Sequence, residues 1–277
     1  MDILVFAPHP DDAELFCGGI IATSIKQGHK VGIVDMTRGE MSSRGDLATR
    51  AKETEMASQI LGVDVRVNLG LPDGQINRDS AALSRQHQLA SVVGQIRQHQ
   101  PRIILAPYWQ ERHPDHEAAA QLIKDAAFFS GVRKFVSAPD LPAYTAPSLL
   151  FYQLRVAFEP SLIVNTTEAW PQKLAAIKAY SSQVTPVSTV DAFNVSDTKL
   201  NTATNSDSDH GFKTLLSSEL SLQSIESRDA YYGKMIGVSY GEPLLSLSPI
   251  AASDLLTTME SSLANRPLIF PNYTRRG

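Results

Sequence analysis

The sequence has little cysteine, no long apolar run and no run of basic residues, and each absence excludes a class of protein. Cys17 is the only cysteine among the 277 residues, so no disulfide can form within the chain. No apolar segment approaches the roughly 20 residues that a membrane-spanning helix needs, and the first residues lack the basic and apolar regions of a signal peptide. The net charge is −4, so a nucleic-acid partner is not expected. We therefore predict a cytoplasmic protein that binds neither membrane nor nucleic acid.

Strand and helix patterns alternate four times in the first half of the chain. Strands are expected at 3–7, 30–37, 65–71 and 102–107, and helices at 13–28, 46–62, 79–100 and 115–129. This alternation predicts an α/β fold with a Rossmann-like, mostly parallel sheet and helices on both of its faces.

The pattern loosens after residue 130. Further strands are expected at 149–154 and 161–167, and further helices at 169–183 and 215–237. Residues 184–212 are rich in Ser, Thr, Asn and Asp and predict a long polar loop insertion. The tail after Gly241 has no clear period, and no sharp boundary divides the chain. We therefore expect one domain over residues 1–277.

Residues 7–14, APHPDDAE, place one histidine and two aspartates directly after the first apolar strand. Burying two carboxylates is costly unless they are paired or bind a metal. The carboxyl ends of strands in an open α/β sheet are where ligands bind. The plain alternative is that one aspartate caps the next helix. A cap leaves His9 and the second aspartate unexplained.

Residues 113–116, HPDH, form a second cluster after the fourth strand, with Pro114 suited to the first helical position. The plain alternative is again a capped helix with exposed histidines. If the two strands are neighbours, both clusters meet at one point. Two histidines and one carboxylate then form the ligand set of a hydrolytic zinc site. A magnesium-dependent phosphoryl-transfer enzyme is a weaker alternative because imidazole favours zinc, and a sugar-binding protein without turnover is another.

The motif pair resembles the LmbE/PIG-L family of zinc-dependent N-acetylglucosamine deacetylases. HPDDAE at 9–14 matches the family's first signature, and HPDH at 113–116 matches the second, in the same order and strand context. The resemblance implies an LmbE-like fold and removal of the acetyl group from a small-molecule N-acetylglucosamine conjugate. It implies zinc binding by His9, Asp12 and His116, although such a ligand set also accepts Fe²⁺. Family members form trimers or hexamers, which implies a homo-oligomer.

The resemblance also implies catalytic roles. Asp11 is expected to be the general base. His113 is expected to stabilise the oxyanion or protonate the leaving amine, with Asp115 orienting it.

The stretch TRGE at 37–40 resembles the branch that deacetylates N-acetylglucosaminyl-malate in bacillithiol biosynthesis. Arg50 matches an arginine that reaches the substrate in the family, and Asp73 matches a residue that binds a sugar hydroxyl. Arg38 is a further candidate for substrate binding. An ordinary surface charge is the alternative for Arg38, and a plain turn is the alternative for Asp73. Inositol conjugates, chito-oligosaccharides and antibiotic precursors are the other substrates that the resemblance allows.

Overall fold

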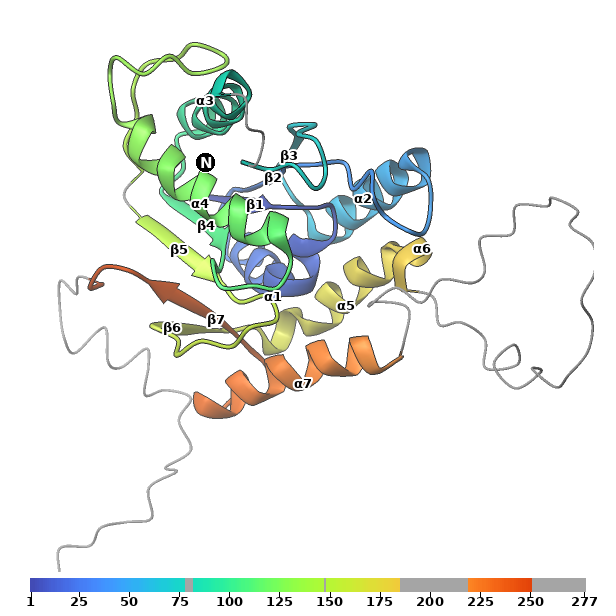
Figure 1. The fold of residues 1–277 in the computed structure, drawn as a ribbon. Coiled ribbons are helices and arrows are strands. Elements are labelled where there is room, and N and C mark those ends of the chain that lie inside the picture. Colours follow the sequence, from blue (N-terminus) through green and yellow to red (C-terminus); the bar gives the residue numbers. More distant parts are fainter. Residues whose placement is uncertain (78–81, 147, 185–218, 251–277) are drawn as a thin grey trace, which may run out of the picture.

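The computed structural model describes residues 1–77, 82–146, 148–184 and 219–250 (Figure 1). The strands are β1 (Ile3–Ala7), β2 (Val31–Asp35), β3 (Val65–Asn68), β4 (Ile103–Pro107), β5 (Ser148–Tyr152), β6 (Leu162–Asn165) and β7 (Gly241–Ser246). The helices are α1 (Asp12–Lys26), α2 (Leu47–Leu61), α3 (Ala82–His99), α4 (Pro114–Ser130), α5 (Trp170–Ala179), α6 (Ser181–Val184) and α7 (Glu219–Met235), with a 3₁₀ turn at Thr167–Ala169. None of the described helices combines the length and apolar composition needed to cross a bilayer.

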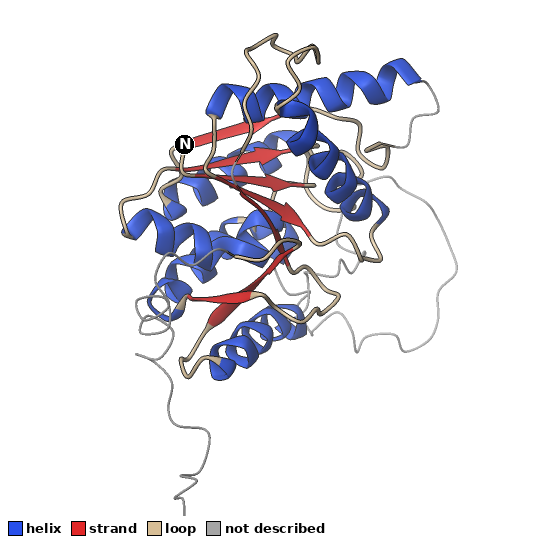
Figure 2. Ribbon diagram, turned by 90° about the vertical axis from the view of Figure 1, so that its left-hand side faces the viewer, coloured by secondary structure: helices blue, strands red, loops and turns tan. Residues whose placement is uncertain are grey.

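Within the described residues, the strands form one sheet in the order β3-β2-β1-β4-β5-β7-β6 (Figure 2). The first five strands in this order run parallel, and β7 runs antiparallel to both of its neighbours. Alternate residues of β1 face opposite sides of the sheet. Val5 packs in one apolar core with α1, α2, α5 and α7, and Phe6 packs in the other with α3 and α4. The predicted α/β fold with helices on both faces is confirmed.

The order of the strands places a topological switch point between β1 and β4. The chain leaves β1 for α1 on one face of the sheet and leaves β4 for α4 on the other face. A crevice forms at such a point because the two connections diverge. The two clusters predicted from the sequence follow these two strands, so the fold brings them to one edge of the sheet.

Helix α2 begins and ends where its sequence signals predict. The Asp46 side chain accepts a hydrogen bond from the backbone N–H of Thr49, which satisfies one of the free donors of the first turn. Gly62 ends the helix at φ 79°, in the left-handed region that glycine adopts without strain. These ends fix the position of Arg50 on the first turns of the helix.

Strand β7 is the element that the sequence analysis missed. Pro243 argues against a strand inside a sheet because proline cannot donate to the ladder. The structure accommodates it because β7 pairs with β6 over Gly241–Leu244 and with β5 only from Leu244 onward. At Pro243 the strand therefore has a neighbour on one side only. The helix expected at 169–183 is also divided, since Tyr180 has non-helical backbone angles between α5 and α6.

Three expectations fall partly or wholly outside the described residues. They are the start of the helix at 79–100, the start of the helix at 215–237 and the polar loop from residue 185 to 212.

A buried group of charges joins α5, α7 and β7 to the middle of α1. We call Lys173, Arg228, Asp229 and Glu242 the support cluster. The Lys173 ammonium donates to Asp229 Oδ2 and to Glu242 Oε1, and these three side chains are inaccessible to solvent. Glu242 also accepts from the backbone N–H groups of Gly19 and Ile20 at 3.0 and 2.6 Å. These two N–H groups can donate to a side chain because the backbone of α1 is not helical at Cys17, where φ is −140° and ψ is 18°.

Candidate metal and catalytic site

The turn from β1 into α1 has strained backbone at Asp11. Its φ is 114°, in a region that residues with a side chain rarely adopt. Asp11 is the N-terminal cap residue of α1, but its side chain makes no capping hydrogen bond. The structure therefore does not support the alternative in which the Asp11 side chain serves as a helix cap. The strain instead directs the Asp11 carboxylate away from the helix end, as strained residues at functional sites commonly do.

Three predicted metal ligands converge at the switch point. His9 Nδ1 and His116 Nε2 each lie 3.3 Å from the same oxygen, Oδ2 of Asp12. One potential ligand atom from each of the three residues lies within 4.8 Å of the others. Asp12 and His116 are buried and come from different faces of the sheet, through α1 and α4. Two imidazoles and one carboxylate facing each other suit a divalent transition metal.

The far nitrogen of His9 is held by two further carboxylates. His9 Nε2 lies 3.1 Å from Asp73 Oδ1 and 3.6 Å from Asp115 Oδ2. The other Asp73 oxygen accepts from the backbone N–H of Met41, and Asp115 Oδ2 accepts from Gly74 N. A carboxylate on the second ring nitrogen is the usual arrangement that orients a metal-binding histidine. The side chains of Asp73 and Asp115 thus support His9.

The charges and unpaired atoms of this site fit a cation. Within the described residues, His116 Nδ1 and Asp115 Oδ1 are buried without a hydrogen-bond partner. Although burial by itself opposes protonation, the carboxylates of Asp115, Asp12 and Asp73 raise the pKa of His9 well above its ordinary value. The site therefore attracts positive charge. Its nitrogen and oxygen donors match zinc or iron better than magnesium.

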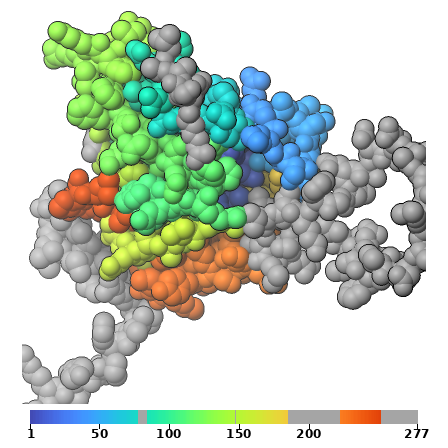
Figure 3. Space-filling view, in the orientation of Figure 1, coloured from blue at the N-terminus to red at the C-terminus, as the bar shows by residue number. Residues whose placement is uncertain are grey.

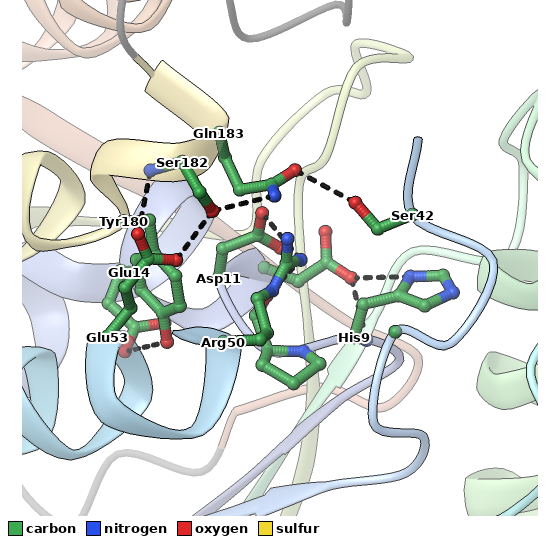
Figure 4. Close-up of polar contacts among 12 residues, drawn as sticks. His9, Asp11, Glu14, Ser42, Arg50, Glu53, Tyr180, Ser182 and Gln183 are labelled. Carbon is green, nitrogen blue, oxygen red and sulfur yellow. Dashed lines mark hydrogen bonds and ion pairs between the residues drawn. The ribbon is translucent and has the colours of Figure 1, made fainter. Parts of the chain in front are cut away.

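Asp11 lies beside these ligands and is fixed by Arg50 (Figure 4). Arg50 Nη2 donates to Asp11 Oδ2 at 3.1 Å and to the carbonyl of Pro10 at 2.7 Å. Burial raises the pKa of Asp11 to about 7, with the Arg50 charge acting in the opposite direction. A carboxylate of this kind suits a general base at neutral pH. Its only side-chain hydrogen bond in the described residues is the one from Arg50, so the other carboxylate oxygen is available for proton transfer.

Arg50 has a different environment from the one expected of a substrate-binding residue. Its side chain is 91% buried, and one nitrogen is already engaged with the turn that carries Asp11. Nε and Nη1 are buried and have no partner within the described residues. Contact of Arg50 with substrate stays a prediction, while its contact with Asp11 is present in the structure.

His113 lies at the mouth of the site and is the N-terminal cap residue of α4. Its Nδ1 accepts from the backbone N–H of Asp115 at 3.2 Å. The ring therefore presents Nε2 as a possible donor. Burial and the charges of His116 and His9 lower the pKa of His113. The Asp115 carboxylate lies against His9 and Gly74 instead, so the contact between Asp115 and His113 is made by the Asp115 backbone N–H.

A buried ion network beneath the turn was not predicted from the sequence. Arg66 donates to both oxygens of Asp35, at 2.8 and 2.9 Å, and to Glu14 Oε1 at 2.5 Å. The Tyr180 hydroxyl also donates to Glu14 Oε1 at 3.1 Å. Glu14 is fully buried and follows Asp12 on α1. The network therefore fixes the start of α1, on which Asp12 lies, to β2, β3 and the end of α5.

A second set of polar contacts joins the loop before α2 to helix α6 at the outer rim of the site. Glu53 on α2 accepts from the hydroxyls of Ser181 and Ser182 and from the Ser182 N–H. Gln183 donates to the carbonyl of Arg44, and its side-chain oxygen accepts from Ser42 (Figure 4). The spacing of these residues in the sequence gave no indication of these contacts. They attach the rim loop before α2 to α6.

Arg38 is the predicted site residue that the structure does not bring to the metal ligands. It is exposed, and its guanidinium lies over Gly70, on the loop after β3. It lines a cavity of about 410 Å³ between α2 and β3, to which Arg50 also contributes. Figure 3 shows a hollow on this face of the molecule, in which the start of the chain, in dark blue, is visible between α4, in green, and the light-blue part of the chain that includes α2.

Comparisons with known proteins identify the relatives of this chain. Residues 4–127 match the family model described as GlcNAc-PI de-N-acetylase, PIG-L. The chain is 27% identical over 191 residues to diacetylchitobiose deacetylase of Thermococcus kodakarensis, which covers 65% of this chain and 69% of that protein. It is 26% identical over 196 residues to a probable N-acetyl-α-D-glucosaminyl L-malate deacetylase 2 of Bacillus anthracis, covering 65% and 80%. The crystal structure of the conserved protein TT1542 from Thermus thermophilus is similar with a TM-score of 0.73, at 34% identity, covering 92% of this chain and 98% of that one.

Proposed function

Because the chain belongs to the PIG-L (LmbE) family of deacetylases, we propose that it is a zinc-dependent hydrolase that removes the acetyl group from an N-acetylglucosamine conjugate. The observation that carries this proposal is the convergence of His9, Asp12 and His116 beside the buried carboxylate of Asp11. Such a site combines metal ligands with a base, as metal-assisted amide hydrolysis requires.

The ion would be held by His9, Asp12 and His116. When bound, zinc polarises a carbonyl and makes water more acidic. Asp11, held by Arg50, takes a proton from the water that attacks the acetyl carbon. The carbon–nitrogen bond then breaks, the proton passes to the leaving amine, and acetate and the free amine are the products.

His113 stabilises the oxyanion in this proposal. Its Nδ1 already accepts a hydrogen bond from the backbone, so the neutral ring carries its proton on Nε2. A donor placed at the mouth of the site can stabilise the charge that develops on the carbonyl oxygen. Proton donation to the amine by His113 is the other role that the sequence left open.

N-acetylglucosaminyl-malate is the substrate that we propose first. The support is the TRGE stretch at 37–40 and the similarity to the Bacillus anthracis protein. The similarity to the Thermococcus kodakarensis enzyme makes a chito-oligosaccharide the main alternative. Arg38, Arg50 and Asp73 are the candidates for substrate contact, and Asp73 would have to combine this with its contact to His9.

The proposal is tested by measuring acetate release from three substrates with the zinc-loaded protein. The substrates are N-acetylglucosaminyl-malate, N,N′-diacetylchitobiose and free N-acetylglucosamine, and Asp11→Asn is the control variant. Release from the malate conjugate that disappears in the variant supports the proposal in full. Release from chitobiose alone keeps the reaction and replaces the substrate. Equal release by wild type and Asp11→Asn would reject the proposed mechanism.

A further inference from the structure

A cavity lies at the end of the sheet opposite the metal site. Its volume is about 860 Å³, roughly twice that of the cavity between α2 and β3. We call it the strand-start cavity, and its apolar floor is formed by Ile20, Ile103, Leu150, Leu162, Val164 and Leu244. The floor includes the starts of β4 and β5, whereas the metal ligands follow the ends of β1 and β4. At about 3.3 Å per residue, roughly 16 Å of strand separates the two regions.

The floor of this cavity is apolar sheet surface that the described helices leave incompletely covered. Strands β4 and β5 lie inside the sheet, between β1 and β7. Parallel strands in such a position are normally buried on both faces, as all residues of β1 are. Ile103 of β4 and Leu150 of β5 are nevertheless partly exposed, and so are Leu162 and Val164 of β6. All four pack at the edge of the core that contains α1.

The chain leaves the described part of the fold at the rim of this cavity. Leu247 and Ile250, which follow β7, line the cavity, and their side chains are 52% and 58% exposed. Large apolar residues that are exposed beside an apolar cavity mark an interaction surface. Residues 251–277 follow directly and lie outside the described residues. The segment after Ile250 therefore needs no linker to reach the floor.

The sequence after Ile250 carries apolar residues suited to this floor. The tail as a whole has no clear period, but large apolar residues recur early in it at intervals of three and four, which fall on one side of a helix: Leu255, Leu256, Met259 and Leu263. A helix over 255–263 is about 13 Å long. The strand spacings from β4 through β5 and β7 to β6 add up to about 14 Å. Such a helix would span the floor.

The charges of this segment and of the cavity are of opposite sign. The charged or titratable side chains that line the cavity are those of His29 and Lys124, and none of its described lining residues is acidic. Residues 251–263 include Asp254 and Glu260 but no lysine, arginine or histidine. Exposed charge pairs contribute little stability, so they favour this occupant at the rim while apolar contact supplies most of the gain.

We propose that residues 251–263 of the same chain dock in the strand-start cavity as a short amphipathic helix, with Leu256 and Met259 against its floor. The docked segment completes the apolar core on the α1 face of the sheet. Because the cavity and the metal ligands lie at opposite ends of the strands, loss of docking lowers stability and leaves the metal site unchanged. This inference does not rest on the proposed deacetylase function.

Two substitutions on opposite sides of the segment test the proposal in the full-length protein. Met259→Asp places a charge against the floor. Ser261→Asp is the matched control, because two residues along a helix correspond to about 200° of rotation. We expect Tm to fall by about 5 °C or more in Met259→Asp and by less than about 2 °C in Ser261→Asp, with the zinc-dependent Tm shift retained in both. Equal Tm values for the two variants would overturn the proposal.

Hydrogen exchange of the same proteins, followed by mass spectrometry, shows which surface the segment covers. In the wild type, the amides of 255–263 should exchange at least about tenfold more slowly than in a free peptide of that sequence. Met259→Asp should restore fast exchange there and raise exchange in the edge strand β6, whereas Ser261→Asp should do neither. Exchange of the wild-type segment at the rate of the free peptide would reject docking.

Cross-linking separates docking within one chain from docking on a second copy. Cys17 is buried, so cysteines introduced at exposed positions react with a short bismaleimide in its place. Gln27→Cys, at the cavity rim on the end of α1, is combined with Ser262→Cys. In the control pair, Lys52→Cys on α2, at the other end of the sheet from β6, replaces Gln27→Cys (Figure 1). We expect a link within one chain from the first pair alone. Links between two chains, or equal yields from both pairs, contradict the proposal.

Discussion

Two clusters of buried charge contact the same helix, α1, and they differ in how completely their charges are compensated. The support cluster pairs two cations, Lys173 and Arg228, with two carboxylates, Asp229 and Glu242. None of its side-chain atoms is a buried atom without a partner in the described residues. It is therefore complete without any ligand.

The cluster at the start of α1 is not compensated in this way. We call Asp11, Asp12, Glu14, Asp35 and Asp115, with Arg50 and Arg66, the site cluster. Its carboxylates outnumber its guanidinium groups, and Glu14, Arg50 and Asp115 each have buried atoms without partners in the part of the chain that the structure describes. Excess buried negative charge is unfavourable unless a cation neutralises it. The difference indicates that the support cluster stabilises the fold and that the site cluster is built around an ion.

The largest difference between the clusters is expected from one neutral substitution in each. Asp11→Asn should lower kcat by ~10²–10⁴-fold, because it removes a general base. It should leave Tm unchanged or raise it, because burial disfavours the charged form of this carboxylate. Steady-state kinetics and thermal unfolding of the same zinc-loaded sample measure both. Asp229→Asn in the support cluster should do the reverse, with a lower Tm and little change in kcat. Similar effects of the two variants would remove the distinction between the clusters.

Loss of the cation from the support cluster should destabilise the protein strongly. Lys173→Met removes the cation that Asp229 and Glu242 share. Asp229 keeps Arg228, but Glu242 is left buried without a charged partner among the described residues, and breaking such a pair costs about 3–5 kcal/mol. Urea unfolding gives the change in the free energy of unfolding. Lys178→Met is the matched control, since Lys178 is exposed on the same helix and should change stability by less than about 0.5 kcal/mol. A loss equal to that of the control would contradict a stabilising role.

Zinc should stabilise the folded protein by binding at the site cluster, and this gain should not depend on the support cluster. Zinc at 100 times its dissociation constant should add about 2.7 kcal/mol to the metal-free protein, because a ligand of the folded state stabilises that state. Differential scanning fluorimetry with and without zinc measures the shift in Tm. His116→Ala should abolish the shift, whereas Lys173→Met should lower the starting Tm and retain the shift. A full zinc shift in His116→Ala would exclude this ligand set.

A smaller effect is expected when the partner of the base is changed. Arg50→Gln removes a charged hydrogen bond to Asp11, which is worth about 1.5–3 kcal/mol. We expect kcat to fall roughly tenfold to a hundredfold, since this is the same free energy expressed as a rate. If instead KM rises and kcat is retained, Arg50 acts on the substrate, as the sequence resemblance predicts.

The sequence was sufficient for the parts of the site that depend on short segments. His9, Asp12 and His116 lie in two short motifs, each directly after an apolar strand. The rule that strand ends meet at one edge was enough to group the two motifs, and the family resemblance selected these three residues. The helices expected at 46–62 and 115–129 also begin within one residue of those bounds, at Leu47 and Pro114. The fold class followed from the alternation of strands and helices.

Partners far apart in the chain could not be predicted from spacing. Glu14 and Arg66 are 52 residues apart, and Lys173 and Glu242 are 69 residues apart, so neither pair has a local signal. Asp73 was predicted as a sugar contact from the family resemblance, but its contact with His9 depends on how the loops after β1 and β3 meet. Strand β7 was missed because Pro243 opposes strand formation unless pairing is one-sided at that residue.

The most direct test measures bound metal and acetate release in the same samples. Metal-free protein is loaded with increasing zinc, dialysed and divided between elemental analysis and an acetate assay with N-acetylglucosaminyl-malate and N,N′-diacetylchitobiose. The account predicts that activity rises in proportion to bound zinc up to one ion per chain, and that His116→Ala neither retains the ion nor releases acetate. Acetate release at the full rate by protein that holds no metal would contradict it.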